Sequence, residues 1–167
     1  MMTYRLLLFC LSLFLCVLNG CGGGPAKPAD FPDLVRPVTI KIHKGGTPLN
    51  NITVILHSKD AALQYLVTGV TGSDGVATIQ TSRNTYGAPG VPAGKYLVQL
   101  TEVLNVDLAP LGMDVTPQQE AAWTKEYNEK ADKIRSFSKV LTKAGTTPLE
   151  IDVASSPATV EFDVSTY

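Results

Sequence analysis

The chain has 167 residues, a length that fits one domain of ordinary size. It carries 14 Lys and Arg against 15 Asp and Glu, so its net charge of −1 gives no reason to expect nucleic-acid binding. Hydrophobic residues make up 44% of the chain, which excludes a wholly disordered protein.

The first twenty residues have the features of an export signal. Arg5 supplies a positive charge ahead of the apolar run from Leu6 to Leu18. That run is too short to span a bilayer, but its length fits the apolar region of a signal peptide. We therefore predict that residues 1–20 are a signal peptide.

The next residues, Leu18-Asn19-Gly20-Cys21, resemble the lipobox of bacterial lipoproteins. The resemblance implies a diacylglyceryl group on the Cys21 thiol, cleavage before Cys21 and acylation of the new amine. Several acyl chains on one residue suffice for stable membrane anchoring. Gly22, rather than Asp, follows the cysteine, which in a Gram-negative cell implies the outer membrane. The alternative is an ordinary secretory signal cut near Gly20, with no special role for Cys21.

Cysteine usage agrees with this interpretation. Of the three cysteines, Cys10 and Cys16 lie in the predicted signal peptide and Cys21 is the lipid site. The processed chain would then have no thiol for a disulfide, a thiolate metal site or a nucleophile. Residues 21–33, rich in Gly and Pro, predict a lipidated flexible tether ahead of a folded domain at 34–167.

Short segments in which apolar and polar residues alternate follow the tether, and each predicts a half-buried strand. The predicted strands cover residues 38–43, 52–57, 63–70, 76–80, 95–100, 148–153 and 159–164. Asp74-Gly75 marks a hairpin turn between the third and the fourth. Short strands at this spacing predict a mainly β protein with the architecture of a sandwich or barrel.

The ordered motifs of residues 38–100 resemble those of carboxypeptidase regulatory-like domains. The motifs are Val-x-Ile-x-Ile from Val38, Gly-Gly-x-Pro-Leu from Gly45, Thr-Gly-x-Asp-Gly from Thr71 and Val-Pro-Ala-Gly-Lys-Tyr-Leu-Val from Val91. The resemblance implies a seven-stranded transthyretin-like (prealbumin-like, Ig-like) sandwich. The Thr-Thr-Pro-Leu and Val-x-Phe-Asp-Val segments near the C-terminus are also similar to small exported lipoproteins of planctomycete-type bacteria.

One helix is predicted between the fifth and sixth strands, at residues 117–137. Thr116 is the expected N-cap, Pro117 suits the first helical position, and Gln119 completes a capping box. The apolar residues of this helix share one stripe, formed by Trp123, Tyr127, Ala131 and Ile134.

That stripe has two interpretations. It either docks the helix on its own sandwich or leaves Trp123 and Tyr127 exposed as a contact surface for a protein or glycan. Tyr86, in a Gly- and Pro-rich stretch predicted to be a loop, is a candidate member of the same surface.

The chain offers little material for catalysis or metal binding. Its only histidines, His43 and His57, lie at predicted strand ends without a known ligand spacing. Asp74 fits a turn better than a calcium site, which needs six to eight oxygen ligands. No nucleophile elbow, zinc-protease motif or phosphate loop occurs. We expect no cofactor, no metal and no enzymatic activity.

These features predict a lipid-anchored binding or structural module of the cell envelope. Its expected partners are the membrane, through the lipid on Cys21, and an envelope protein or glycan. The alternative is an accessory subunit that positions a protein partner in an envelope transport or secretion complex.

Overall fold

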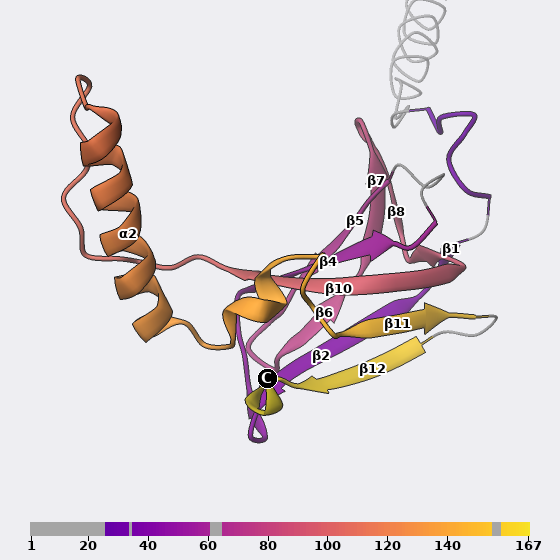
Figure 1. Cartoon of the computed structure of the whole chain (residues 1–167). Coiled ribbons are helices and arrows are strands. Elements are labelled where there is room, and N and C mark those ends of the chain that lie inside the picture. The colour runs from indigo at the N-terminus through magenta and orange to yellow at the C-terminus, as the bar shows by residue number, and fades with distance from the viewer. Residues whose placement is uncertain (1–25, 34, 61–64, 155–157) are drawn as a thin grey trace, which may run out of the picture.

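The computed structural model of this chain describes residues 26–33, 35–60, 65–154 and 158–167 (Figure 1). The predicted signal peptide and Cys21 lie outside these ranges. Among the described helices, none combines the length and the hydropathy needed to cross a membrane.

The protein is mainly β, with twelve strands and one α-helix in the described residues. The strands are β1 (Val35–Arg36), β2 (Val38–Lys44), β3 (Thr47–Pro48), β4 (Ile52–Ser58), β5 (Leu66–Val70), β6 (Val76–Thr78), β7 (Gln80–Arg83), β8 (Tyr86–Pro89), β9 (Val91–Pro92), β10 (Gly94–Glu102), β11 (Glu150–Val153) and β12 (Ala158–Asp163). The helix is α2 (Pro117–Ile134), and two 3-10 turns lie at Lys139–Thr142 (η1) and Val164–Thr166 (η2).

The predicted count of seven strands is therefore too low. Each predicted strand has a counterpart, in β2, β4, β5, β6, β10, β11 and β12. The five additional strands span only two to four residues each, too short for alternation to reveal them. Two of them, β8 and β9, lie in the Gly- and Pro-rich stretch that was expected to be a loop.

Two larger sheets share the core. One contains six strands in the order β11-β10-β4-β5-β7-β8, all antiparallel to their neighbours. The other contains β12, β2 and β3, with β6 also paired to β2, and β12 runs parallel to β2. A small pair, β1-β9, completes the set.

The chain changes sheets within the predicted strand at 76–80. β6 pairs with β2 in one sheet and β7 pairs with β5 in the other, and the fully buried Ile79 lies between them. One extended segment therefore links both sheets.

The inward faces of the long strands form one hydrophobic cluster. Alternate residues of β2, β4 and β10 point inward because successive side chains of a strand face opposite sides. Phe137, Leu141 and Leu149, from the connection between α2 and β11, join the same cluster. Sheets and connection thus share a single core.

The N-terminal end of the described chain is attached to the sandwich. Phe31 is 3% exposed, and its ring meets those of Tyr65 and Tyr86 edge to face at centroid distances of 5.6 and 4.6 Å. Asp30 pairs with Arg83, and its carbonyl accepts a hydrogen bond from the Tyr65 hydroxyl. Phe31, which the sequence placed in the tether, therefore packs on the domain.

The helix α2 begins as predicted. Gln119 donates its backbone N–H to Thr116 Oγ1 at 3.3 Å, and the Thr116 N–H donates to Gln119 Oε1 at 2.8 Å, so the capping box forms. The helix ends at Ile134 rather than 137. Beyond it the chain extends at Arg135, Ser136 donates its N–H to Glu102, and Phe137 enters the core.

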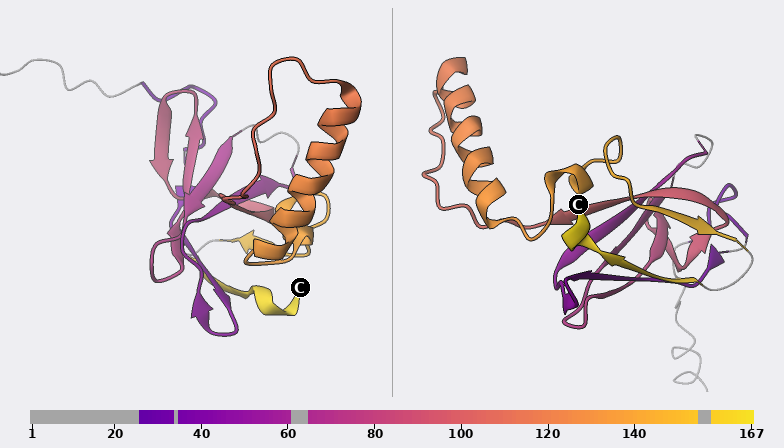
Figure 2. Two further views of the ribbon diagram at one scale, coloured as in Figure 1. Left: turned by 90° about the vertical axis from the view of Figure 1, so that its left-hand side faces the viewer. Right: turned by 60° about the horizontal axis from the view of Figure 1, so that its bottom comes forward.

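The helix and the segment before it extend away from the sheets as one unit, the projection (residues 103–135; Figures 1 and 2). Residues 103–116, its arm, run antiparallel to α2. Three polar contacts show this: Glu102 Oε1 accepts from Ser136 N–H, the Asp107 carbonyl from Lys130 Nζ, and the Ala109 carbonyl from Trp123 Nε1. The only α2 residue that is fully buried is Ala131.

Candidate functional site

The predicted aromatic pair on α2 is brought together. The Trp123 and Tyr127 rings stack with centroids 5.2 Å apart and planes 17° from parallel. Both side chains are half-buried, and the Trp123 indole donates to the Ala109 carbonyl at 2.8 Å. Trp123 therefore bonds to the arm, and Figure 1 shows α2 standing apart from the sheets, whereas one interpretation of the sequence had the stripe dock the helix on its own sandwich.

Tyr86 lies elsewhere. It belongs to β8, where its ring packs on Phe31, and Figure 1 shows β8 and α2 on opposite sides of the molecule. The structure thus does not join Tyr86 to Trp123 and Tyr127 in one surface.

Apolar side chains are exposed at the tip of the projection. Leu111, Met113 and Val115 lie where the arm turns into α2, and Met113 is fully exposed. Val103, at the base of the arm, is 97% exposed. None of these residues was predicted to be a site from the sequence. In the sequence, the three residues at the tip alternate with Gly112 and Asp114, a strand-like spacing in a segment that forms no strand.

Charge on the projection is unbalanced. Residues 103–135 carry six Asp and Glu against four Lys and Arg, a net charge of −2. Glu126 and Lys130 form an i,i+4 ion pair at 3.0 Å. The excess of acid favours a partner with basic groups.

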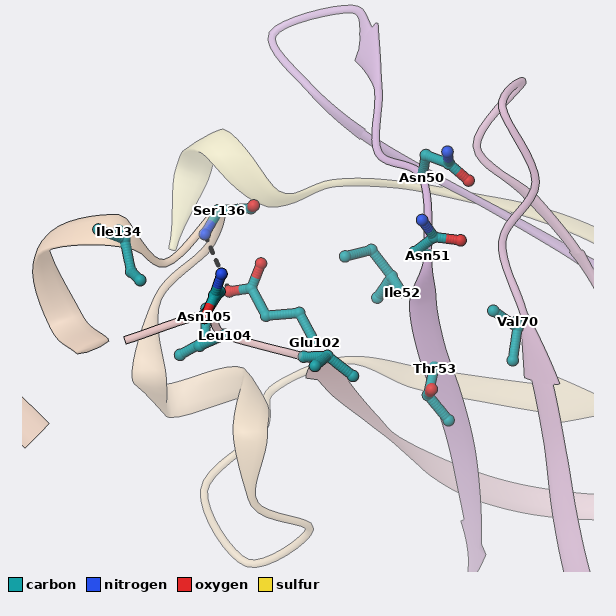
Figure 3. A pocket seen from close by; sticks show the side chains of 11 residues that line it. Asn50, Asn51, Ile52, Thr53, Val70, Glu102, Leu104, Asn105, Ile134 and Ser136 are labelled. Atoms are coloured by element: carbon teal, nitrogen blue, oxygen red, sulfur yellow. Dashed lines mark hydrogen bonds between the residues drawn. The ribbon is translucent and has the colours of Figure 1, made fainter. Parts of the chain in front are cut away.

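A groove of about 680 Å³ lies where the projection meets the sandwich (Figure 3). One side of the groove is formed by the loop before β4, the start of β4, and the ends of β5 and β10. The arm and the end of α2 form the other side. Its lining residues are Asn50, Asn51, Ile52, Thr53, Val70, Glu102, Val103, Leu104, Asn105, Ile134 and Ser136. Because these residues are far apart in sequence, no local sequence motif predicts the groove.

Among the described residues, Glu102 is the only charged one in that lining. Its Oε1 accepts the backbone N–H of Ser136 at 2.9 Å, as the dashed line in Figure 3 shows. The carboxylate thereby fastens the end of the projection to the end of β10. This hydrogen bond closes the base of the projection, and it also orients the negative charge of Glu102 in the groove.

Neither histidine is placed for metal binding. His43 Nε2 lies 3.1 Å from Glu161 Oε1, and its Nδ1 accepts the Gly46 N–H at 3.2 Å. His57 Nε2 lies 2.7 Å from Gln99 Oε1 on the neighbouring strand. Within the part of the chain that the structure describes, no group of three or more His, Cys, Asp or Glu could hold a metal ion.

Two carboxylates stabilise turns. Asp163 accepts bonds from the hydroxyl and N–H of Ser165 and from the N–H of Gly45, and these bonds lower the pKa of Asp163 to about 2. Asp74 Oδ1 accepts the Val76 N–H at 3.0 Å, a bond that closes the predicted turn. Both arrangements are structural, since each carboxylate is already bound to backbone groups.

The proposed lipid site, Cys21, lies outside the described residues. Comparison of the chain with protein-family models, with curated proteins and with solved structures finds no match.

Proposed function

We propose that this protein is a lipid-anchored, non-catalytic module of the cell envelope that presents its projection to a protein partner. The lipobox-like residues around Cys21 support the anchor. The projection supports the binding role, because a helix and arm with an exposed apolar tip stand clear of the sheets.

The observation that carries this proposal is where the N-terminal segment and the projection are each attached to the sandwich. The N-terminal segment packs beside β7 and β8, and β1 pairs with β9 just before β10 begins. The projection leaves after the last residue of β10. A strand of nine residues spans roughly 30 Å, so an anchor at Cys21 would hold the projection on the side away from the lipid.

We also propose that the sandwich is of the transthyretin-like type. The motifs that resemble carboxypeptidase regulatory-like domains fall on β2, on the turn before β6, and on β9 and β10. These elements supply much of the shared core. Of the additional short strands, β7 and β8 extend the six-stranded sheet beyond β5, β3 pairs with β2, and β1 and β9 form a separate pair.

A second candidate function is an accessory subunit that positions a partner within an envelope transport or secretion complex. The exposed Leu111, Met113 and Val115 favour it, since apolar side chains in one exposed place mark protein interaction sites. The two candidates differ in whether the partner is itself part of a larger assembly.

Two variants test the proposal in cells. Cys21→Ser should move the protein out of the membrane fraction or leave it unprocessed. A photo-crosslinker in place of Met113 should give one adduct of defined size in the anchored protein, whereas the same group at Lys44, exposed beside the β2–β3 turn, should not. Normal membrane fractionation of Cys21→Ser would refute the anchor. Equal adducts from both crosslinker positions would refute the projection as the binding element.

A further inference from the structure

We propose that the groove at the base of the projection binds the ammonium group of a lysine side chain within an extended segment of a protein partner. This inference rests on the proposed function only in taking the ligand to be part of a protein. It names a site that is separate from the apolar tip and does not require the anchor at Cys21.

The charge of the groove selects the sign of the ligand. Within the described parts of the chain, Glu102 is its only charged lining residue, and no Lys, Arg or His lines it. Among the described residues, only the Ser136 N–H bonds to this carboxylate, and it does so at Oε1. Oε2 is therefore available to a donor, and an ammonium group is the donor that a half-buried carboxylate favours most.

The apolar part of the lining suits the stem of the same side chain. Val70 and Ile134 are 57% and 51% exposed, on either side of the groove that Glu102 enters (Figure 3). A lysine side chain has a four-carbon stem that packs on such aliphatic groups while its charged end reaches a polar atom. The groove thus offers both surfaces that a lysine requires.

The amides in the lining suit a peptide backbone. Asn50, Asn51 and Asn105 each carry a side-chain donor and an acceptor, and Thr53 adds a hydroxyl. The Asn51 N–H is already bound to the Thr71 carbonyl, which holds this loop at the start of β4. Neutral groups of this kind match the N–H and C=O groups of an extended segment.

Other ligand classes fit less well. An anionic ligand would meet Glu102 with no basic residue in the lining to offset the repulsion. A glycan would find no aromatic ring there, because the rings of Trp123 and Tyr127 stack on each other higher on α2. A basic segment also agrees with the net negative charge of the projection.

Titration of the full chain in detergent micelles, followed by two-dimensional NMR, tests this site. The probes are an N-acetylated, C-amidated Ala-Lys-Ala peptide and the same peptide with Nε-acetyl-lysine. The lysine peptide should shift the amide signals of Asn51, Thr53 and Asn105 at millimolar concentration. Acetylation should weaken its affinity by about tenfold, because the acetylated side chain is neutral.

Two glutamate variants separate a local effect from the general field of the projection. Glu102→Gln keeps a carbonyl oxygen for the Ser136 N–H but removes the charge, and should lower affinity for the lysine peptide by about tenfold. Glu129→Gln removes the same charge from an exposed position on α2 and should change affinity by less than about twofold.

Three results would each overturn the proposal. They are equal affinity for the two peptides, an equal loss in both glutamate variants, and the absence of shifts at the lining residues. The comparison of the two peptides uses the unaltered chain, so it holds even if Glu102→Gln perturbs the fold. Peptide binding without a crosslink from residue 113 would retain the groove and reject the proposed function. A crosslink from residue 113 without peptide binding would retain the proposed function and reject the groove.

Discussion

The sandwich and the projection are held together in different ways. In the sandwich, alternate residues of β2, β4 and β10 are buried in one cluster. In the projection, two polar contacts join the arm to α2 and a third, between Glu102 and Ser136, closes its base; the aromatic pair is half-buried, and Ala131 alone is fully buried. Because burial of apolar surface dominates folding free energy, we expect the sandwich to carry most of the stability, and the projection is the element that we propose for recognition.

The largest expected effect follows from truncating a side chain in the shared core. Ile40 in β2 is fully buried, so Ile40→Ala should lower the free energy of unfolding by about 4 kcal/mol. Urea denaturation measures this loss. The matched control is Val103→Ala in the exposed arm, which should change it by less than about 0.5 kcal/mol. Similar losses for both variants would remove the contrast between the two regions.

A smaller effect is expected at a polar group that is buried in the core. Tyr96 donates its hydroxyl to the Pro92 carbonyl at 2.9 Å, and Tyr96→Phe should cost about 1 kcal/mol at neutral pH.

The same tyrosine should make the sandwich less stable at high pH. Burial raises the pKa of Tyr96 from 10.0 to about 12, because the interior disfavours the phenolate. Since folding favours the neutral hydroxyl, its contribution is complete below pH 10 and is lost as the pH rises toward 12. Tyr96→Phe should weaken that alkaline loss. An unchanged pH profile would contradict the buried, neutral state of Tyr96.

In the projection, Trp123→Ala should leave global unfolding almost unchanged, within about 0.5 kcal/mol. Its ring packs on Tyr127 and its indole bonds to the arm rather than to the sheets. The variant should instead increase hydrogen exchange across α2 alone. A loss of several kcal/mol in global stability would mean that the projection and the sandwich unfold as one unit.

The smallest effect concerns the turn at the end of β12. The pKa of Asp163 is lowered to about 2 by its bonds to Ser165 and Gly45, so its contribution is present above pH 3.8 and is lost as the pH falls toward 2. Asp163→Asn should reduce the acid-side change in an unfolding titration followed by circular dichroism. Asp152→Asn, at an exposed position on β11, serves as the control. Equal profiles for the two variants would contradict the role of Asp163.

Local patterns predicted most of the sandwich. β2, β4 and β10 have seven to nine residues, long enough for alternation to be unambiguous, and the Thr116 capping box located the start of α2. The change of sheet at Ile79 was missed because the alternation of apolar residues continues through it.

The candidate site was harder to predict because it depends on long-range contacts. The stripe of Trp123 and Tyr127 was identified from helical spacing, but its partner was not, since the arm forms no regular element that would reveal it. In the sequence, the apolar residues Leu104, Val106 and Leu108 alternate with Asn105 and Asp107, and this alternation was the available signal. The groove joins residues 50–53 to residues 102–105 and to Ile134 and Ser136, which only the folded chain brings together.

Removal of the projection tests the central claim most directly. Glu102 contacts Ser136, so residues 103–135 can be replaced by a linker of about three glycines, which reaches up to ~10 Å. Phe137 and Leu141 remain to complete the core. We predict one cooperative thermal transition within about 4 °C of that of the intact protein. A melting point lowered by more than about 10 °C, or the loss of a cooperative transition, would contradict the division between a stable sandwich and a separable projection.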